Sequence, residues 1–471
     1  MLNRGLGTLL FVDRSRSLSR PLVVAAVALS LFVAACTSST DTTAATDPGG
    51  SSTTATTTTS VPESSPTTLP PTTVAVSASE GIPQDVVDEL VDEIGELVRE
   101  TEEVRGLPFL QAPAVAILDE EAFSQRVFTM LEEDLDEEEL AVDGRLLQLL
   151  GMLDADTDYY TLILDLFTEQ VAGFYDTDTQ ELVVPASTDG FSPLQRTVVV
   201  HELIHALTDQ HFDLGDQLDE QYENGTGDDY ASLQALSEGD ATYFQFVYLE
   251  GMSPLQAVQA AAEALTIDTS VLDSVPGWMR ADLTFPYDQG LTFVASQVDI
   301  GGIAGVDTAY LAPPVTTEQI LDPSKYVGNE LPVELPPLTV EVTGWDLYDE
   351  GSWGEWGLRM LFFDTLSPGM LTQTASGWGN DFYRVFSSGD DVATVIHYIG
   401  DTEQDAEEVA NAFVVHLRKA MGAGGAVESG GGLLYNLGSI YGFVDRVDDE
   451  VIFVAATDKT VGADIRTQLG L

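Results

Sequence analysis

Hydrophobic and polar positions first follow a regular pattern near Ile82, where we expect the folded sequence to begin. PQDVVDELVDEIGELVRE spaces its aliphatic residues for one helix face and its acids for the other, which predicts a surface helix. The residues of the buried stripe are Val87, Leu90, Val91, Ile94, Leu97 and Val98. Beyond this helix, AVAIL at 114–118 predicts a short strand, and helical patterns follow over 120–135 and 145–153.

Two apolar runs between residues 170 and 186 flank the polar stretch DTDTQ, which predicts a β-hairpin. The edge of such a hairpin is a candidate place for an extended peptide to pair antiparallel to the strand. The alternative is an edge that only packs against the rest of the fold.

The helix that follows the hairpin has a well-marked start. Ser192 is a suitable N-cap, Pro193 fits the first helical position, and Gln195 completes an S-x-x-Q capping box. After an acidic, glycine-containing loop, the pattern predicts a second helix over 230–250 and a third helical region over about 253–266.

The Pro-rich passage NELPVELPPLTVEV, at 329–342, marks a plausible junction. Beyond it the patterns predict a helix at 354–366, a strand at 392–400, a helix at 401–422 and a hairpin that turns at Asp448 and Asp449. His397 and His416 lie on an apolar strand and helix, and we interpret them as structural.

These elements predict an α+β fold in two parts. We expect a helix-rich domain over residues 82–330 and a smaller α+β region over residues 331–471.

The first 36 residues have the features of a bacterial secretory leader. Four arginines precede an apolar run of fifteen residues (21–35), which is too short for an ordinary membrane span. The run ends in VAAC, which resembles the lipobox of bacterial lipoproteins, where the cysteine is lipidated. Cys36 is the only cysteine of the chain, so no intrachain disulfide can form. We expect a lipid anchor at Cys36 on the extracytoplasmic face of the cell membrane; a plain signal peptide is the alternative.

Residues 37–80 are mostly Thr, Ser, Pro, Ala and Gly, a composition that predicts a disordered linker. Loss of the leader removes four arginines and Asp13, so the net charge changes from −60 to 14 − 77 = −63. Nucleic-acid binding is disfavoured, because it requires clustered lysines and arginines. The acidic surface is typical of a saline habitat or of high solubility; a preference for cationic substrates is the alternative.

Three of the five histidines fall within VVVHELIHALTDQHF, at 198–212. His201 and His205 are four residues apart, so on a helix their imidazoles project from one face and can bind one metal ion. Glu202 follows the first histidine, where its carboxylate can reach water at the metal without ligating it. This H-E-x-x-H pattern on a capped, amphipathic helix indicates a catalytic Zn²⁺ site.

Catalytic zinc usually takes three protein ligands, so a third must come from elsewhere. His211 has the spacing of the metzincin pattern, but Thr208 replaces the glycine at which the chain would leave the helix. On an unbroken helix His211 points about 120° away from His205. Glu238, in ALSEGDATYF, is the preferred ligand: the sequence here is similar to the gluzincins, which use a glutamate from the next helix, often followed by small residues such as Gly239 and Ala241.

More broadly, the chain resembles a family of largely uncharacterised bacterial zinc metallopeptidase lipoproteins of gluzincin type. The shared stretches occur in order over most of residues 85–420: LFTEQVAGFYD, HELIHALTDQHFDL, SEGDAT, FPYDQG, TTEQILDPSKY and SGWGNDFY. The resemblance implies a zincin-like catalytic domain. Relatives often carry histidine where Asp322 stands here, and many gluzincins have, at the position of Thr242, an aspartate that orients a ligand imidazole. Asp240 is the remaining candidate for orienting a ligand imidazole.

These features predict hydrolysis of peptide bonds in peptides or proteins, with Glu202 as general base and zinc as cofactor. Tyr287, in FPYDQG, is a candidate donor to the developing oxyanion, with a core role as its alternative. Two other functions stay open. One is a binding or scaffolding lipoprotein with a vestigial zinc site, against which the intact Glu202 argues; the other is a zinc hydrolase for a non-peptide amide, such as a cell-wall component.

Overall fold

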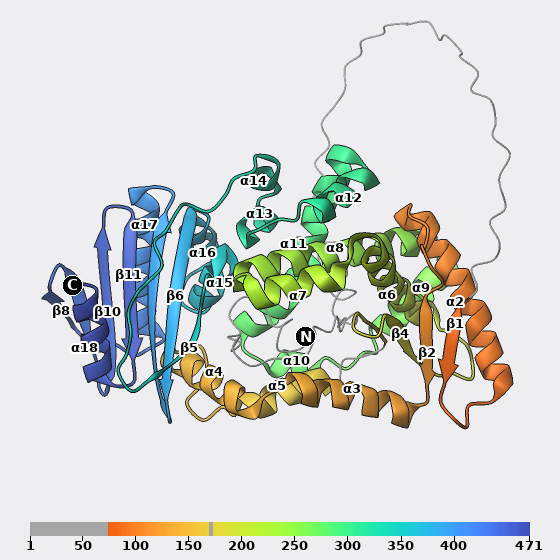
Figure 1. The fold of residues 1–471 in the computed structure, drawn as a ribbon, viewed down its shortest axis with the longest axis horizontal. Coiled ribbons are helices and arrows are strands. Elements are labelled where there is room, and N and C mark those ends of the chain that lie inside the picture. The colour runs from red at the N-terminus through yellow and green to blue at the C-terminus, as the bar shows by residue number, and fades with distance from the viewer. Residues whose placement is uncertain (1–73, 169–172) are drawn as a thin grey trace, which may run out of the picture.

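The computed structural model describes residues 74–168 and 173–471. The predicted leader, Cys36 and most of the predicted linker lie outside these residues. The fold is a mixture of helices and two separate sheets, so the predicted α+β class is confirmed. A small sheet and a larger one lie at opposite ends of the molecule with helices between them (Figure 1). Within the described residues, no helix is long and apolar enough to cross a membrane.

The smaller sheet has four strands in the order β1-β2-β4-β3. Its strands are β1 (Ala75–Ala78), β2 (Ala114–Leu118), β3 (Phe174–Asp176) and β4 (Glu181–Pro185). The first three strands in that order run parallel, and β3 pairs antiparallel with β4 at the edge. The predicted hairpin and the strand at 114–118 are therefore confirmed.

The folded region begins earlier than the predicted Ile82, because β1 lies inside the stretch that we assigned to the linker. β1 is held by parallel backbone pairing with β2 over four residues. Val76 also packs against the apolar cluster beside this sheet. Backbone pairing of so short a strand depends little on residue type. The Thr- and Ser-rich composition around β1 therefore gave no signal that predicts it.

Three long helices lie against the small sheet or close to it: α2 (Gln84–Arg105), α6 (Pro193–Phe212) and α8 (Gly227–Gly251). α6 begins as predicted: Ser192 Oγ accepts from the Gln195 N–H, and Gln195 Oε1 accepts from the Ser192 N–H. α8 begins three residues before the predicted 230, because Thr226 and Asp229 form a second capping box there.

Part of the acidic loop predicted between these helices is itself helical, as α7 (Leu214–Asn224), because its apolar residues Leu214, Leu218 and Tyr222 are buried on one side. The other helices before residue 330 are α3 (Glu120–Asp134), α4 (Glu137–Leu149), α5 (Tyr159–Thr168), α7 (Leu214–Asn224), α9 (Pro254–Ala264), α10 (Ser270–Ser274), α11 (Gly277–Gly301), α12 (Ile303–Leu311), α13 (Thr317–Leu321) and α14 (Pro323–Val327).

The larger sheet has seven antiparallel strands in the order β5-β6-β7-β11-β10-β9-β8. Its strands are β5 (Asp346–Gly351), β6 (Trp378–Ser388), β7 (Asp391–Gly400), β8 (Ala426–Ser429), β9 (Gly432–Leu437), β10 (Ile440–Val447) and β11 (Glu450–Ala456). The helices of this part are α15 (Gly354–Phe362), α16 (Pro368–Ala375), α17 (Glu403–Lys419) and α18 (Lys459–Gln468). The predicted helices, the strand at 392–400 and the turn at Asp448 are confirmed.

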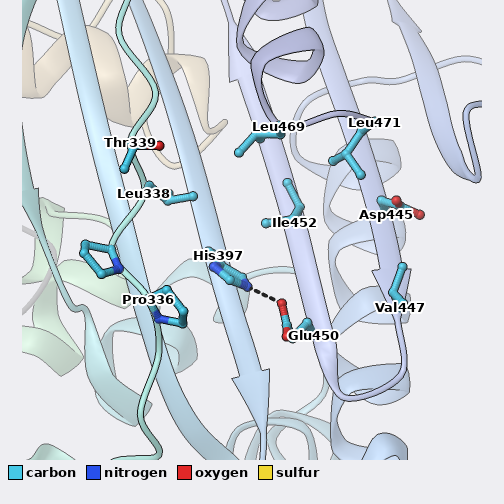
Figure 2. A pocket seen from close by; sticks show the side chains of 11 residues that line it. Pro336, Leu338, Thr339, His397, Asp445, Val447, Glu450, Ile452, Leu469 and Leu471 are labelled. Atoms are coloured by element: carbon cyan, nitrogen blue, oxygen red, sulfur yellow. Dashed lines mark hydrogen bonds and ion pairs between the residues drawn. The ribbon is translucent and has the colours of Figure 1, made fainter.

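The Pro-rich junction contains neither helix nor strand, yet Leu338, Val340 and Val342 are buried against one face of the larger sheet. Beside this segment a groove of about 330 Å³ lies between Pro336 and the C-terminal Leu471 (Figure 2). On its floor His397 Nε2 lies 2.7 Å from Glu450 Oε2, so this histidine has a structural partner.

The opposite face of the larger sheet packs on elements from the first half of the chain. α4 lies against β7 and contributes Leu140, Leu146 and Leu147 to a cluster that also contains Phe453. Tyr348 of β5 donates its hydroxyl to Asp143 Oδ1 over 2.8 Å. The parts on either side of the predicted boundary thus share one hydrophobic core.

His416 of α17 makes another link between the two parts. Its Nε2 lies 2.7 Å from the carbonyl oxygen of Leu150. Burial lowers the pKa of His416 to about 4, so the ring is neutral at pH 7 and Nε2–H donates to the carbonyl. The structural role predicted for this residue agrees with these contacts.

Candidate metal centre

Helix α6 places the H-E-x-x-H residues inside the protein. His201, Glu202 and His205 are fully buried, in a helix whose middle turns are buried on every side. One helical turn separates the two imidazoles, and their Nε2 atoms lie 3.1 Å apart. Two ring nitrogens that face each other at this distance form a ready pair of metal ligands.

Helix α8 brings Glu238 to the same point. Glu238 Oε2 lies 3.2 Å from His201 Nε2 and 3.4 Å from His205 Nε2, and the residue is 2% exposed. Burial alone would raise the pKa of Glu238, but the adjacent imidazoles outweigh it and lower the pKa to about 2. Burial has the opposite effect on His201 and lowers its pKa. The surroundings therefore favour an ionised Glu238 carboxylate and a neutral His201 imidazole, which are the protonation states that metal binding requires of these two residues.

The three donor atoms fit zinc. Zinc–nitrogen and zinc–oxygen bonds of about 2.0–2.1 Å in a tetrahedral arrangement place neighbouring ligand atoms about 3.3–3.4 Å apart. The separations here are 3.1, 3.2 and 3.4 Å. Two imidazoles and one carboxylate are a known donor set for catalytic zinc and leave the fourth position to water.

Close packing of α8 on α11 carries Glu238 into this position. A Cβ added to Gly239 would overlap the backbone carbonyl of Gly290, and one added to Gly290 would overlap the carbonyl oxygen of Ala235. The two helices therefore meet backbone to backbone, one residue away from the candidate ligand.

We expect Gly290→Ala to destabilise the protein by about 1–3 kcal/mol, because the added methyl group forces α8 and α11 apart. Thermal melting of the metal-free protein measures this change. Gly95→Ala is the matched control: it lies in the middle of α2 with no atom near the added methyl, and we expect it to stabilise by up to about 1 kcal/mol. Equal melting temperatures for the two variants would contradict the close contact.

Glu202 lies beside the ligand pair without joining it. The backbone N–H of Tyr175, on β3, donates to Glu202 Oε2 over 2.9 Å. Glu202 Oε1 is buried and has no hydrogen-bond partner among the residues that the structure describes. Burial and the nearby Glu238 raise the pKa of Glu202 well above its usual value. The carboxylate thus has one anchored oxygen and one available oxygen.

Tyr287 of α11 faces the same centre. Its ring stacks against that of His201 with 6.4 Å between the centroids, and the residue is buried. The candidate oxyanion donor is therefore in the neighbourhood of the centre, although it also belongs to the packed interior.

Asp240 does not orient an imidazole, contrary to the prediction. Its Oδ2 accepts from Arg105 Nε over 3.0 Å and from the Tyr310 hydroxyl over 3.1 Å. The reason is helical geometry, since a residue two positions after Glu238 lies about 200° around the helix. Ser237 contacts a ligand imidazole instead, because its Oγ lies 3.2 Å from His205 Nδ1.

His211 lies away from the centre because α6 continues unbroken to Phe212. Its Nε2 lies 2.7 Å from the carbonyl oxygen of Pro108. Asp322, the position at which relatives often carry histidine, caps α14 through the Ser324 N–H and so lies outside the centre as well.

A second group of acids, Glu318, Glu330 and Asp401, already surrounds a cation of the chain itself. Lys325 Nζ lies 2.6 Å from Glu318, 2.7 Å from Glu330 and 3.5 Å from Asp401. This group is an ion-pair cluster, and it gives no reason to expect a second metal.

Sequence reasoning missed Tyr175, Ser237 and Asp209 at this centre. Tyr175 acts on Glu202 through its backbone, so no side-chain pattern could reveal it. Ser237 precedes the predicted ligand directly, and that adjacency was an available signal. Asp209 lies one turn after His205 on α6, where it accepts from the Tyr175 hydroxyl.

Comparison with known proteins bears only on the C-terminal part. Residues 343–466 match a family model described as "Domain of unknown function (DUF8575)". The match starts directly after the Pro-rich junction and covers the larger sheet with its helices. No curated protein and no solved structure matches the chain.

Proposed function

We propose that this protein is a zinc-dependent peptidase with a zincin-like catalytic region of gluzincin type. The observation that carries the proposal is the convergence of two imidazoles and a carboxylate, from two helices, next to a buried glutamate. One oxygen of that glutamate has no hydrogen-bond partner in the part of the chain that the structure describes. A purely structural zinc site has no need for that glutamate, which argues against a vestigial centre in a binding or scaffolding lipoprotein.

His201, His205 and Glu238 would hold the zinc ion. When bound, zinc acts as a Lewis acid that lowers the pKa of water towards 7 and polarises a carbonyl group. Glu202 accepts the proton of the attacking water through Oε1 and delivers it to the leaving amine. Tyr287 would donate a hydrogen bond to the oxygen on which charge develops. Hydrolysis then proceeds without a covalent intermediate with the protein.

The edge strand β3 suits an extended substrate, because it is the last strand of its sheet and lies beside α6. Its Tyr175 N–H is engaged by Glu202, so a peptide can use that donor only if Glu202 releases it. Peptides or proteins outside the cell are the proposed substrates, with the enzyme tethered to the membrane by lipid at Cys36. A non-peptide amide, such as a cell-wall component, is the second candidate substrate class because it needs the same chemistry.

The test uses the chain without its first 36 residues and a diverse peptide library. We expect about one zinc per chain, cleavage of a subset of peptides, loss of cleavage with a chelator and recovery when zinc is restored. Cleavage that persists after the metal is removed would contradict the proposal. Bound zinc with cleavage of cell-wall amides alone would favour the second substrate class.

A further inference from the structure

Asp209 is a buried carboxylate of α6 that accepts hydrogen bonds from three residues outside that helix. It is 5% exposed. Its Oδ2 accepts from the Tyr175 hydroxyl over 2.8 Å and from Gln180 Nε2 over 3.3 Å, and its Oδ1 accepts from the Gly215 N–H over 2.8 Å. Asp209 therefore ties the β3–β4 hairpin and the start of α7 to the helix that carries the candidate ligands.

Tyr175 is attached to α6 at two points. Its backbone N–H donates to Glu202 Oε2 over 2.9 Å, and its hydroxyl donates to Asp209 Oδ2 over 2.8 Å. Residues 202 and 209 are two turns apart, or about 10.5 Å along the helix axis. A single residue of β3 thus spans two turns of α6, and both ends of that span are hydrogen-bonded.

This attachment controls the orientation of the Glu202 side chain. Oε2 is held by the Tyr175 N–H, which leaves Oε1 as the oxygen without a partner among the described residues. β3 is only three residues long and lies at the edge of its sheet, so its neighbours in the sheet hold it on one side only. The hydroxyl contact to Asp209 supplies the restraint on the other side.

Two chemical features stabilise the hydrogen bond between the Tyr175 hydroxyl and Asp209. Burial and the adjacent Asp209 raise the pKa of Tyr175, so its hydroxyl keeps its proton and remains a donor. Three neutral donors satisfy the oxygens of Asp209, which offsets the cost of burying its charge.

We propose that Asp209 and Tyr175 are a positioning pair for Glu202: Asp209 fixes Tyr175 through its hydroxyl, and the Tyr175 N–H then holds the base in one orientation. The effect on catalysis rests on the proposed role of Glu202 as general base. The restraint itself does not, and can be measured separately.

The activity test compares Tyr175→Phe, Asp209→Ala and the double variant with the wild type, all loaded with zinc. Tyr175→Phe keeps the backbone donor and removes only the hydroxyl. We expect kcat to fall by about tenfold or more in each variant, because misplacement of a catalytic group by about 1 Å can cost up to a hundredfold. KM and zinc affinity should stay within about twofold, and the double variant should lose little more than the single ones, since both changes break one contact.

Tyr348→Phe is the matched control. Tyr348 is also buried and also donates to a buried aspartate, Asp143, over 2.8 Å, but it lies on β5 of the larger sheet. It should lose a similar amount of stability with no change in kcat. A wild-type kcat in Tyr175→Phe, an effect confined to KM, or an equal loss of kcat in Tyr348→Phe would each overturn the proposal.

Hydrogen exchange gives a readout that needs no substrate. We expect the amides of residues 174–176 to exchange at least tenfold faster in Tyr175→Phe and Asp209→Ala than in the wild type and Tyr348→Phe. Glu202→Ala, which removes the acceptor itself, is the positive control. Unchanged exchange in the two pair variants overturns the restraint. If the wild type cleaves no peptide, the proposed function fails, while this measurement still decides whether Asp209 orders Tyr175.

Discussion

Glu202→Gln should bind zinc as tightly as the wild type and lose about 10²- to 10⁴-fold in kcat. Glutamine has the same shape, and its amide oxygen can still accept from the Tyr175 N–H that now holds Glu202 Oε2 over 2.9 Å. Glu202 is not one of the three residues whose donor atoms converge, so metal affinity should be unaffected. The amide cannot take a proton from water, however, and that step is the one the proposal assigns to this residue.

The measurement pairs steady-state kinetics on a cleaved peptide with a zinc titration of the metal-free protein. Glu355→Gln is a suitable control, because Glu355 is also buried and lies on α15 in an ion pair with Arg359. That variant should keep its kcat. Turnover near the wild-type rate in Glu202→Gln would show that another group is the base.

Glu238→Gln should weaken zinc binding by at least 100-fold. The pKa of Glu238 is lowered to about 2, so the wild type offers zinc an anionic oxygen, whereas the variant offers a neutral amide. Changes to residues that merely support a ligand already cost about 10–100-fold in affinity, which sets the lower limit for loss of the ligand itself. Catalysis should disappear with the metal at ordinary zinc concentrations.

Competition with a chelator of known affinity measures this change, and two variants provide controls. Glu250→Gln alters an exposed acid near the end of the same helix and should leave zinc affinity unchanged. His211→Gln should also leave it unchanged, because the His211 ring lies against the Pro108 carbonyl. Loss of zinc in His211→Gln with tight binding in Glu238→Gln would reverse the choice of third ligand.

The elements predicted most accurately are those marked by local features of the sequence, such as capping residues and apolar spacing. The capping residues Ser192 and Gln195 set the start of α6, and apolar spacing located α2 and α17. The elements that sequence reasoning missed depend on partners far along the chain. β1 is a strand because β2 lies beside it, and α7 is a helix because its apolar side is covered.

The same division applies to the candidate centre. Two histidines four residues apart on a helix face one way whatever surrounds them, so their pairing could be predicted from spacing. The approach of Glu238 was an inference from the resemblance, and the geometry that permits it, the contact between Gly239 and Gly290, involves residues 51 positions apart in sequence. Asp240 was the remaining candidate because Thr242 stands where many gluzincins have an aspartate, and the structure turns its side chain towards Arg105 instead.

The covering of the larger sheet by α4 has a practical consequence for the region that matches a known family. Residues 343–466, excised on their own, would keep α17, whose Phe413 stacks on Phe453, but would lose the cover that α4 gives to β7, because Leu140, Leu146 and Leu147 stay with the rest of the chain. Such a fragment should expose apolar side chains and therefore be prone to aggregate. We therefore expect residues 343–466 to fold stably only when α4, or an equivalent cover for β7, is present.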